Sequence, residues 1–190
     1  AGTGYASYLW SDGSSAQTLP VSTAGTFTVT VTSAFGCIGS TSASTVVNAL
    51  PVPVITGINT ICQGATTTFD AGAGYSAYLW SNGATTQTIT QGAAGVYTVT
   101  VTDGNLCSNY TSISLNVNAL PVPAIAGTTA FCQGDHSNLN AGTGYSAYLW
   151  STGATTQVIN VTNAGNYTAT VTDANGCTNN TSTLITVDPN

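Results

Sequence analysis

A spacing of 70 residues recurs along the chain and constrains its fold more than any other feature. The segment Tyr5–Trp10 (YASYLW) returns as Tyr75–Trp80 and as Tyr145–Trp150, both YSAYLW. Repeats of this length are units of one supersecondary design that stack along a chain. The sequence therefore predicts tandem domains rather than one merged fold. Three cysteines keep the same spacing without insertion or deletion: Cys37, Cys107 and Cys177.

The repeat divides the chain into three predicted domains. Complete units cover residues 51–120 and 121–190, since Leu-Pro-Val-Pro at residues 50–53 returns at 120–123. Residues 1–50 match only the last 50 positions of a unit and lack its opening strands. A sandwich without those strands would leave sheet edges and core exposed. We expect an upstream segment or another copy to complete the first domain, and we favour truncation of a longer chain.

Within a unit, apolar and polar residues alternate with the period of two that is typical of strands. In Tyr97–Val101 the aromatic and valine side chains fall on one face and the threonines on the other. Ser81-Asn-Gly83 is a tight-turn sequence directly after a tryptophan-bearing strand. No apolar stripe with helical spacing persists. The sequence predicts an all-β fold, with six or seven short strands per unit packed as a two-sheet sandwich.

One motif resembles a known family. Trp-Ser-x-Gly, then Gly-x-Tyr-Thr-Val-Thr-Val-Thr-Asp and then Cys, is similar to the Ig-like and PKD-like repeats of large bacterial surface proteins, such as adhesins and gliding-motility-associated proteins. In the middle unit the motif rests on Trp80, Gly95, Tyr97, Asp103 and Cys107. The resemblance implies tandem immunoglobulin-like β-sandwich repeats of 70 residues and an extracellular or cell-surface location. Repeats of this family mostly serve as spacers, stalks or adhesin units.

The charge composition excludes several partners. The chain has no Lys or Arg, six Asp or Glu residues and one His, with a formal net charge of -6. Nucleic-acid binding depends largely on basic side chains that neutralise phosphates, and anionic membrane surfaces are bound in the same way. No apolar run reaches the 18 residues of a membrane span. We therefore expect neither nucleic-acid binding nor membrane insertion in this segment.

The repeated aromatic residues are predicted to lie in the core. Trp in an Ig-like sandwich packs between the sheets, and a tyrosine after Gly at the start of a later strand forms a tyrosine corner. Exposed rings could instead stack on sugars. We favour core packing, because the cluster recurs in every unit as core residues must. The predicted core residues are Trp10, Trp80, Trp150, Tyr97 and Tyr167.

Two disulfide patterns are compatible with the sequence. We favour pairing inside each unit, Cys62–Cys107 and Cys132–Cys177, because each unit carries its own pair. In a simple Ig order, however, the two cysteines of a unit lie at opposite ends of the sandwich, roughly 20 Å apart, whereas a disulfide needs Cα atoms about 5.5 Å apart. The alternative, Cys62–Cys177, would link neighbouring units and stiffen the array. The partner of Cys37 stays open, and five cysteines favour an oxidising compartment.

The single histidine, the loop aspartates and the cysteine spacing indicate neither a catalytic site nor a metal site. His136 aligns with Thr66, so we expect a solvated surface residue. Asp103 and Asp173 begin loops with oxygen ligands at alternate positions, but each loop offers one carboxylate, so turn residues are favoured over calcium ligands. No cysteine spacing matches a zinc site. We predict no cofactor, no metal and no enzyme activity, since no acid is paired with a base.

The leading functional hypothesis is mechanical. Pro51, Pro53, Pro121 and Pro123 restrict the junctions between units, which favours a semi-rigid rod. Its partners would be further copies of the repeat, in the same chain or in a filament. The alternative is an adhesive binding module whose end loops recognise a glycan or a host protein. A binding module should concentrate its sequence differences in one unit, whereas here the units diverge evenly, which favours the stalk.

Overall fold

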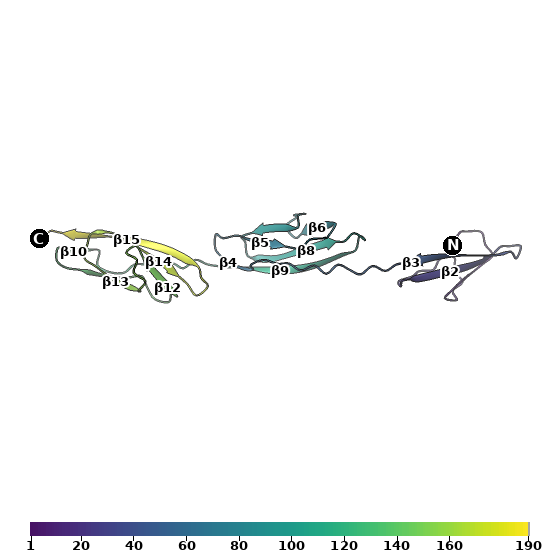
Figure 1. The fold of residues 1–190 in the computed structure, drawn as a ribbon, viewed down its shortest axis with the longest axis horizontal. Coiled ribbons are helices and arrows are strands. Elements are labelled where there is room, and N and C mark those ends of the chain that lie inside the picture. Colours follow the sequence, from purple (N-terminus) through teal and green to yellow (C-terminus); the bar gives the residue numbers. More distant parts are fainter. Residues whose placement is uncertain (190) are drawn as a thin grey trace. The chain divides into compact units, whose positions relative to one another are not determined.

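The computed structural model describes residues 1–189, which form strands joined by turns and loops (Figure 1). Contacts divide the chain into two compact units, one of Ala1–Pro51 with Thr102–Ser108 and one of Val52–Val101 with the residues from Asn109 onward. Within residues 1–189, no helix is long and apolar enough to cross a membrane.

The middle repeat is built from two sheets. The larger sheet has the order β4-β9-β8-β6, and the smaller one pairs β5 with β7. Strands β5 and β7 pair antiparallel, whereas β4 and β9 run parallel. An isolated bridge between Thr56 and Asp70 adds the segment before β4 to the edge of the small sheet. The strands are β4 (Thr60–Cys62), β5 (Thr67–Asp70), β6 (Ala77–Trp80), β7 (Thr88–Gln91), β8 (Gly95–Thr102) and β9 (Ser108–Asn118).

The last repeat reproduces this arrangement 70 positions later. Its large sheet has the order β10-β15-β14-β12, its small sheet pairs β11 with β13, and β10 runs parallel to β15. The bridge between Ala126 and Asn140 matches that of the middle repeat. The strands are β10 (Ala130–Cys132), β11 (Ser137–Asn140), β12 (Ala147–Trp150), β13 (Val158–Val161), β14 (Gly165–Thr172) and β15 (Thr178–Asp188).

This strand order is that of an immunoglobulin-like sandwich. In Ig domains the second and fifth strands lie in one sheet and the third, sixth and seventh in the other. Strands β5 and β7 match the first pair, and β6, β8 and β9 match the second set. The predicted fold class, all-β with tandem Ig-like repeats, is confirmed.

The core of each complete repeat lies between its two sheets. Alternation along β8 buries Val99 and Val101, while Thr100 between them lies on the opposite face and is half-buried. Trp80 and Phe69 supply the largest buried side chains of the middle repeat. Equivalent residues form the core of the last repeat: Leu139, Trp150, Ala169, Val171 and Ile185.

The first repeat consists of one sheet. Strands β1 (Ser7–Trp10), β2 (Gly25–Thr32) and β3 (Ile38–Thr45) pair in the order β1-β2-β3. They correspond to β6, β8 and β9. Val29 at the centre of β2 is buried, but within residues 1–189 no second sheet opposes this one.

Candidate functional site: the joint between successive repeats

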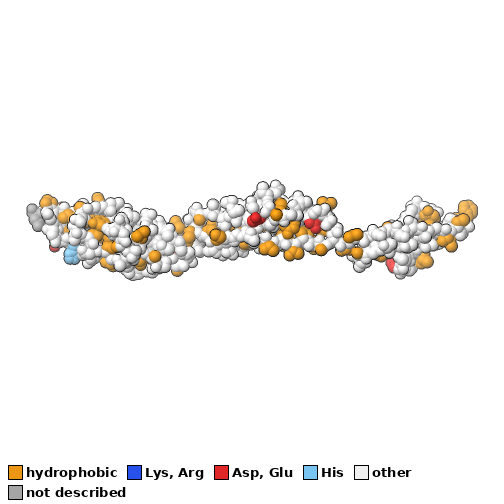
Figure 2. All heavy atoms as spheres, viewed as in Figure 1, with side chains coloured by type: hydrophobic (Ala, Val, Ile, Leu, Met, Phe, Trp, Pro, Cys, Tyr) orange, Lys and Arg blue, Asp and Glu red, His pale blue; other side chains and the backbone are white. Residues whose placement is uncertain are grey.

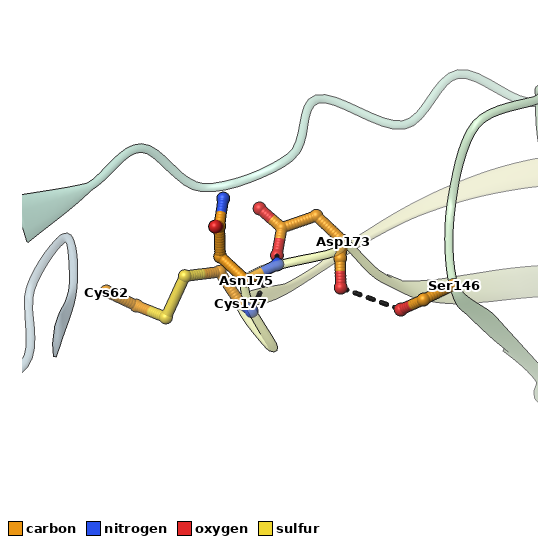
Figure 3. The surroundings of a disulfide bond; sticks show 5 residues. All are labelled: Cys62, Ser146, Asp173, Asn175 and Cys177. Carbon is orange, nitrogen blue, oxygen red and sulfur yellow. Dashed lines mark hydrogen bonds between the residues drawn. A yellow bond between two sulfur atoms is a disulfide. The ribbon is translucent and has the colours of Figure 1, made fainter. Parts of the chain in front are cut away.

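A hairpin tip between β14 and β15 presents Cys177 at the leading end of the last repeat. Asp173 holds this tip closed: its Oδ1 accepts hydrogen bonds from the N–H groups of Asn175 and Cys177, each at 2.8 Å. The N–H of Asp173 donates in turn to the carbonyl oxygen of Cys177 at 2.9 Å. The Ser146 hydroxyl donates to the carbonyl oxygen of Asp173 at 2.7 Å, which ties the tip to the body of the repeat (Figure 3).

The same carboxylate geometry explains why these loops are turns. In the middle repeat Asp103 Oδ1 accepts from the N–H groups of Asn105 at 2.8 Å and Cys107 at 2.9 Å. Each carboxylate therefore satisfies backbone donors of its own turn, as Asp commonly does. Within residues 1–189, no three His, Cys, Asp or Glu side chains gather as a metal site.

Cys62 lies at the opposite, trailing end of its repeat. It is the last residue of β4 and pairs with Asn118, the last residue of β9. The N–H of Gln63 donates to the carbonyl oxygen of Asn118 at 2.8 Å, and the N–H of Ala65 donates to that of Cys62 at 3.0 Å. These bonds turn the chain directly after Cys62, which therefore lies at the end of the sandwich.

Cys62 and Cys177 form a disulfide that joins the middle repeat to the last one (Figure 3). Their Cα atoms lie 5.6 Å apart, although 115 residues separate them in sequence. Cys177 is fully buried at this joint, and Cys62 is half-buried. The bond staples the trailing end of one sandwich to the leading end of the next.

The internal pairing that we favoured, Cys62–Cys107 and Cys132–Cys177, is wrong. Cys62 pairs with the end of β9, whereas Cys107 immediately precedes the start of β9. The ten-residue rise from Ser108 to Asn118 corresponds to roughly 33 Å along the strand, far beyond the reach of a disulfide. Cys107 and Cys132 carry free thiols, as does Cys37; Cys107 is half-buried and the other two are exposed.

The tryptophans of the complete repeats lie in their cores, with 2% of each side chain exposed. The indole N–H of Trp80 donates to the carbonyl oxygen of Thr86 at 2.9 Å, and that of Trp150 to Thr156 at 2.8 Å. A buried ring whose polar atom is satisfied in this way offers no stacking surface for a sugar.

Trp10 departs from the prediction, since it is only half-buried. Its indole N–H still donates to the carbonyl oxygen of Ala16, at 2.8 Å. Within residues 1–189 no second sheet covers this ring, whereas Trp80 and Trp150 are each covered by the smaller sheet of their repeat. It lines an open groove of about 160 Å³ together with Leu19, Val21, Phe27, Ala43 and Thr45.

Tyr97 and Tyr167 take the geometry of a tyrosine corner. The hydroxyl of Tyr97 donates to the carbonyl oxygen of Ala93 at 2.8 Å, and that of Tyr167 to Asn163 at 3.0 Å. Both rings are half-buried and pack against the cores of their repeats. Each therefore fixes the turn that leads into the long strand β8 or β14.

The surface of the described residues is nearly uncharged. Figure 2 shows a face on which uncharged polar groups and backbone are interspersed with hydrophobic side chains, with acidic side chains at a few points. The Gln87 amide donates to Asp70 at 2.8 Å and, with the N–H of Gly72, lowers the pKa of that carboxyl. The N–H of Ser14 lowers the pKa of Asp12 in the same way. His136 is exposed, at the trailing end of the last repeat.

Sequence analysis missed one feature, an open cavity of about 260 Å³ at the trailing end of the last repeat. It carries no motif, because its walls come from three separate segments. Those segments are the residue after β10, the turn between β13 and β14, and the end of β15. They supply Gln133, Thr162, Asn163, Ala164, Val187 and Pro189.

Comparisons with known proteins identify no family. No family model and no curated protein matches the sequence. Among solved structures, the chain is similar to the N-terminal eight Ig domains of Down Syndrome Cell Adhesion Molecule, at 17% identity and a TM-score of 0.46, over 98% of this chain and 31% of that one.

Another similar structure carries the description "Ca2+-stabilized adhesin helps an Antarctic bacterium reach out and bind ice". It has 18% identity and a TM-score of 0.41, over 87% of this chain and 57% of that one. At such low scores these likenesses carry no functional argument. The fold assignment is based on the strand order.

Proposed function

We propose that this chain is a structural repeat region of an extracellular bacterial surface protein, in which Ig-like domains form a semi-rigid stalk or filament. The supporting observation is the Cys62–Cys177 disulfide, which links two successive sandwiches end to end. A bond between neighbours does little for catalysis, but it restricts bending at the junction. It also favours an oxidising, extracellular compartment.

The proposed domain division follows the repeat: residues 1–50 are the later part of one domain, and 51–120 and 121–190 are complete domains. Between the complete domains, Pro121 and Pro123 leave few conformations to the connecting segment. The side-chain amide of Asn179 donates to the carbonyl oxygen of Pro121 at 2.8 Å, so the last repeat itself holds its entry segment. Proline, this hydrogen bond and the disulfide together restrict the same junction.

The proposal is tested by measuring how stiff this junction is. Spin labels placed on exposed residues of the middle and last repeats report a distance distribution by pulsed electron resonance. We expect a narrow distribution in the oxidised protein and a clearly broader one in the double variant Cys62→Ser/Cys177→Ser, which removes the bond and leaves no thiol at the joint. Cys37, Cys107 and Cys132 must be replaced by Ser in both proteins, because they are free thiols. Equally broad distributions would contradict a stalk stiffened by this bond.

The alternative function is adhesive binding of a glycan or a partner protein through the end loops. Burial of Trp80 and Trp150 means that these two rings cannot serve as stacking platforms for a glycan. The two hairpin tips that begin with Asp103 and Asp173 are closed by the same carboxylate hydrogen bond, from the N–H of Cys107 and of Cys177. These two end loops therefore do not differ from each other as the loops of a binding module should. Screening the chain against a glycan array tests this alternative, and saturable binding at micromolar concentration would favour it over the stalk.

A further inference from the structure

The Cys62–Cys177 bond gives tension a short covalent route through the two complete repeats. It joins residues 115 positions apart, so residues 63–176 lie inside a closed covalent loop. We propose that this bond is a mechanical bypass: tension along the stalk passes through residues 51–62 and 177–189, while the other strands of both sandwiches stay outside the load path until the bond is reduced. This inference rests on the proposed function, because a stalk is a structure that carries load along its length.

In the last repeat the load path is a single strand. Cys177 immediately precedes β15, which runs from Thr178 to Asp188. Tension that enters at the Cys177 sulfur therefore leaves at the other end of this strand. A strand rises about 3.4 Å per residue, and a fully extended chain reaches about 3.6 Å per residue. Strand β15 can thus lengthen by only about 2 Å before its backbone is taut.

The core of the last repeat is attached to β15 but is not in series with it. The strand pairs antiparallel with β14 and parallel with β10, and it buries Ile185 against the core. Hydrogen bonds between antiparallel strands are perpendicular to the strands. Tension along a strand that is held at both ends therefore pulls on its backbone rather than on these bonds. Trp150 on β12 and Leu139 on β11 lie inside the loop and carry no load.

In the middle repeat the load path is the segment of residues 51–62. Its end is anchored by the parallel pairing of β4 with the end of β9, and the N–H of Asn116 donates to the carbonyl oxygen of Asn59 at 2.8 Å. Farther upstream, Thr56 and Asp70 exchange two backbone hydrogen bonds of 2.9 and 3.0 Å. A detached segment of this length reaches at most about 40 Å. Strands β5 to β9 stay inside the loop even then.

Without the bond, every strand of both repeats lies in the load path. Tension then crosses the junction at Pro121, whose carbonyl oxygen accepts from the Asn179 side-chain amide at 2.8 Å. Each sandwich is now pulled from its two ends. Complete unfolding releases the residues of the loop, whose extended length is about 400 Å. The bond therefore limits how far the stalk can extend, and reduction removes that limit.

A small-molecule dithiol is sufficient to open the bypass. Cys62 is half-buried and Cys177 is fully buried, so the reagent reaches the Cys62 sulfur first. One dithiol thiolate attacks that sulfur, and Cys177 leaves as a thiolate. The second dithiol thiolate then displaces Cys62. Overall, two protein thiols form and the reagent is oxidised to a cyclic disulfide.

The test is constant-force spectroscopy of the full chain, tethered through peptide tags at its two ends, with Cys37, Cys107 and Cys132 replaced by Ser. The tension is set where Cys62→Ser/Cys177→Ser unfolds slowly. We expect no long extension of the oxidised complete repeats at this tension. Dithiothreitol should then release about 400 Å in one or two steps. The first repeat lies outside the loop, so its contribution should be the same in both states.

The rate of this release shows whether the core carried load while the bond was intact. A core outside the load path is still folded when the bond opens, so its own unfolding limits the release at high reagent concentration. We expect the rate to become independent of dithiothreitol concentration and to rise at least about tenfold in Trp150→Ala. Tyr167→Phe, a milder variant, should raise it a few-fold. Trp10→Ala changes a ring outside the loop and should leave it unchanged.

Two results would overturn the proposal. A long extension of the oxidised protein before dithiothreitol is added would show that the bond does not bridge the load path. A release rate that follows dithiothreitol concentration throughout, and is the same in Trp150→Ala and Tyr167→Phe, would show that tension had already unfolded the core. A narrow spin-label distance distribution in the oxidised protein would still support the stalk in that case, because the stiffness of the joint does not depend on which strands bear the load.

Discussion

Breaking the Cys62–Cys177 bond should strongly destabilise the two complete repeats. The bond closes a loop of 115 residues. In the chain-entropy treatment, closing a loop of this length lowers the entropy of the unfolded chain by about 16 cal/mol/K. At 25 °C this stabilises the folded state by about 5 kcal/mol, when both repeats unfold together. For a folded unit of this size, the loss corresponds to a fall of about 10 to 20 °C in Tm.

The assay is urea unfolding of oxidised wild type and Cys177→Ser, followed by tryptophan fluorescence and far-ultraviolet circular dichroism. Cys177 is fully buried, so its replacement also places a hydroxyl in an apolar position. Cys62→Ser removes the same bond from the half-buried side, and both variants should lose a similar free energy of unfolding. Cys107→Ser is the matched control and should unfold close to wild type. If all four proteins shared one midpoint, the joint would contribute nothing to stability and the reasoning would fail.

Four further perturbations test the sandwich itself. Trp80→Ala should cost about 3 to 5 kcal/mol in urea unfolding, because a side chain only 2% exposed leaves a large cavity. Tyr97→Phe should cost about 1 kcal/mol in the same assay by removing the corner hydrogen bond. Gly57→Ala should cost about 2 to 3 kcal/mol, since its φ is 138° and a Cβ would lie 2.5 Å from a carbonyl oxygen of β5. Asp70→Asn should make the free energy of unfolding less dependent on pH in acid. The Gln87 amide and the N–H of Gly72 lower the pKa of the Asp70 carboxyl in the folded state, so the ionised carboxylate stabilises the fold. This stabilisation is complete above pH 3.8, the ordinary pKa of the carboxyl, and is lost as pH falls through the lowered pKa.

Three of these changes have a control within the chain: Trp80→Ala, Gly57→Ala and Asp70→Asn. Trp10→Ala should cost clearly less than Trp80→Ala, because Trp10 is half-buried. Gly83→Ala places its Cβ in open space, so it isolates the cost of a positive φ from the clash at Gly57. Asn140 accepts from Gln157 at 3.0 Å in the last repeat without a charge, so Asp70→Asn should keep its stability at pH 7. Equal acid transitions for wild type and Asp70→Asn would contradict the linkage argument.

Much of the sandwich was predictable because its signals are local. The alternation of Tyr97–Val101 requires one face in a core and one in solvent, whatever lies around the strand. The 70-residue spacing also predicted that the strands of the two complete repeats recur 70 positions apart, because equivalent residues occupy equivalent positions. Turn residues such as Asp103 accept hydrogen bonds from backbone donors of their own loop, so local sequence was enough to predict their place in a turn.

The joint was decided by tertiary structure, because it depends on which ends of the strands meet. The sequence places one cysteine near the start of a unit and one near its last strand. It does not determine whether β4 runs parallel or antiparallel to β9. Parallel pairing puts Cys62 beside Asn118, a full strand length from Cys107. The burial of Trp10 likewise depends on an opposing layer rather than on its own motif. Strand patterns are set by neighbours in sequence, whereas disulfides and open ends are set by packing between segments far apart in the chain.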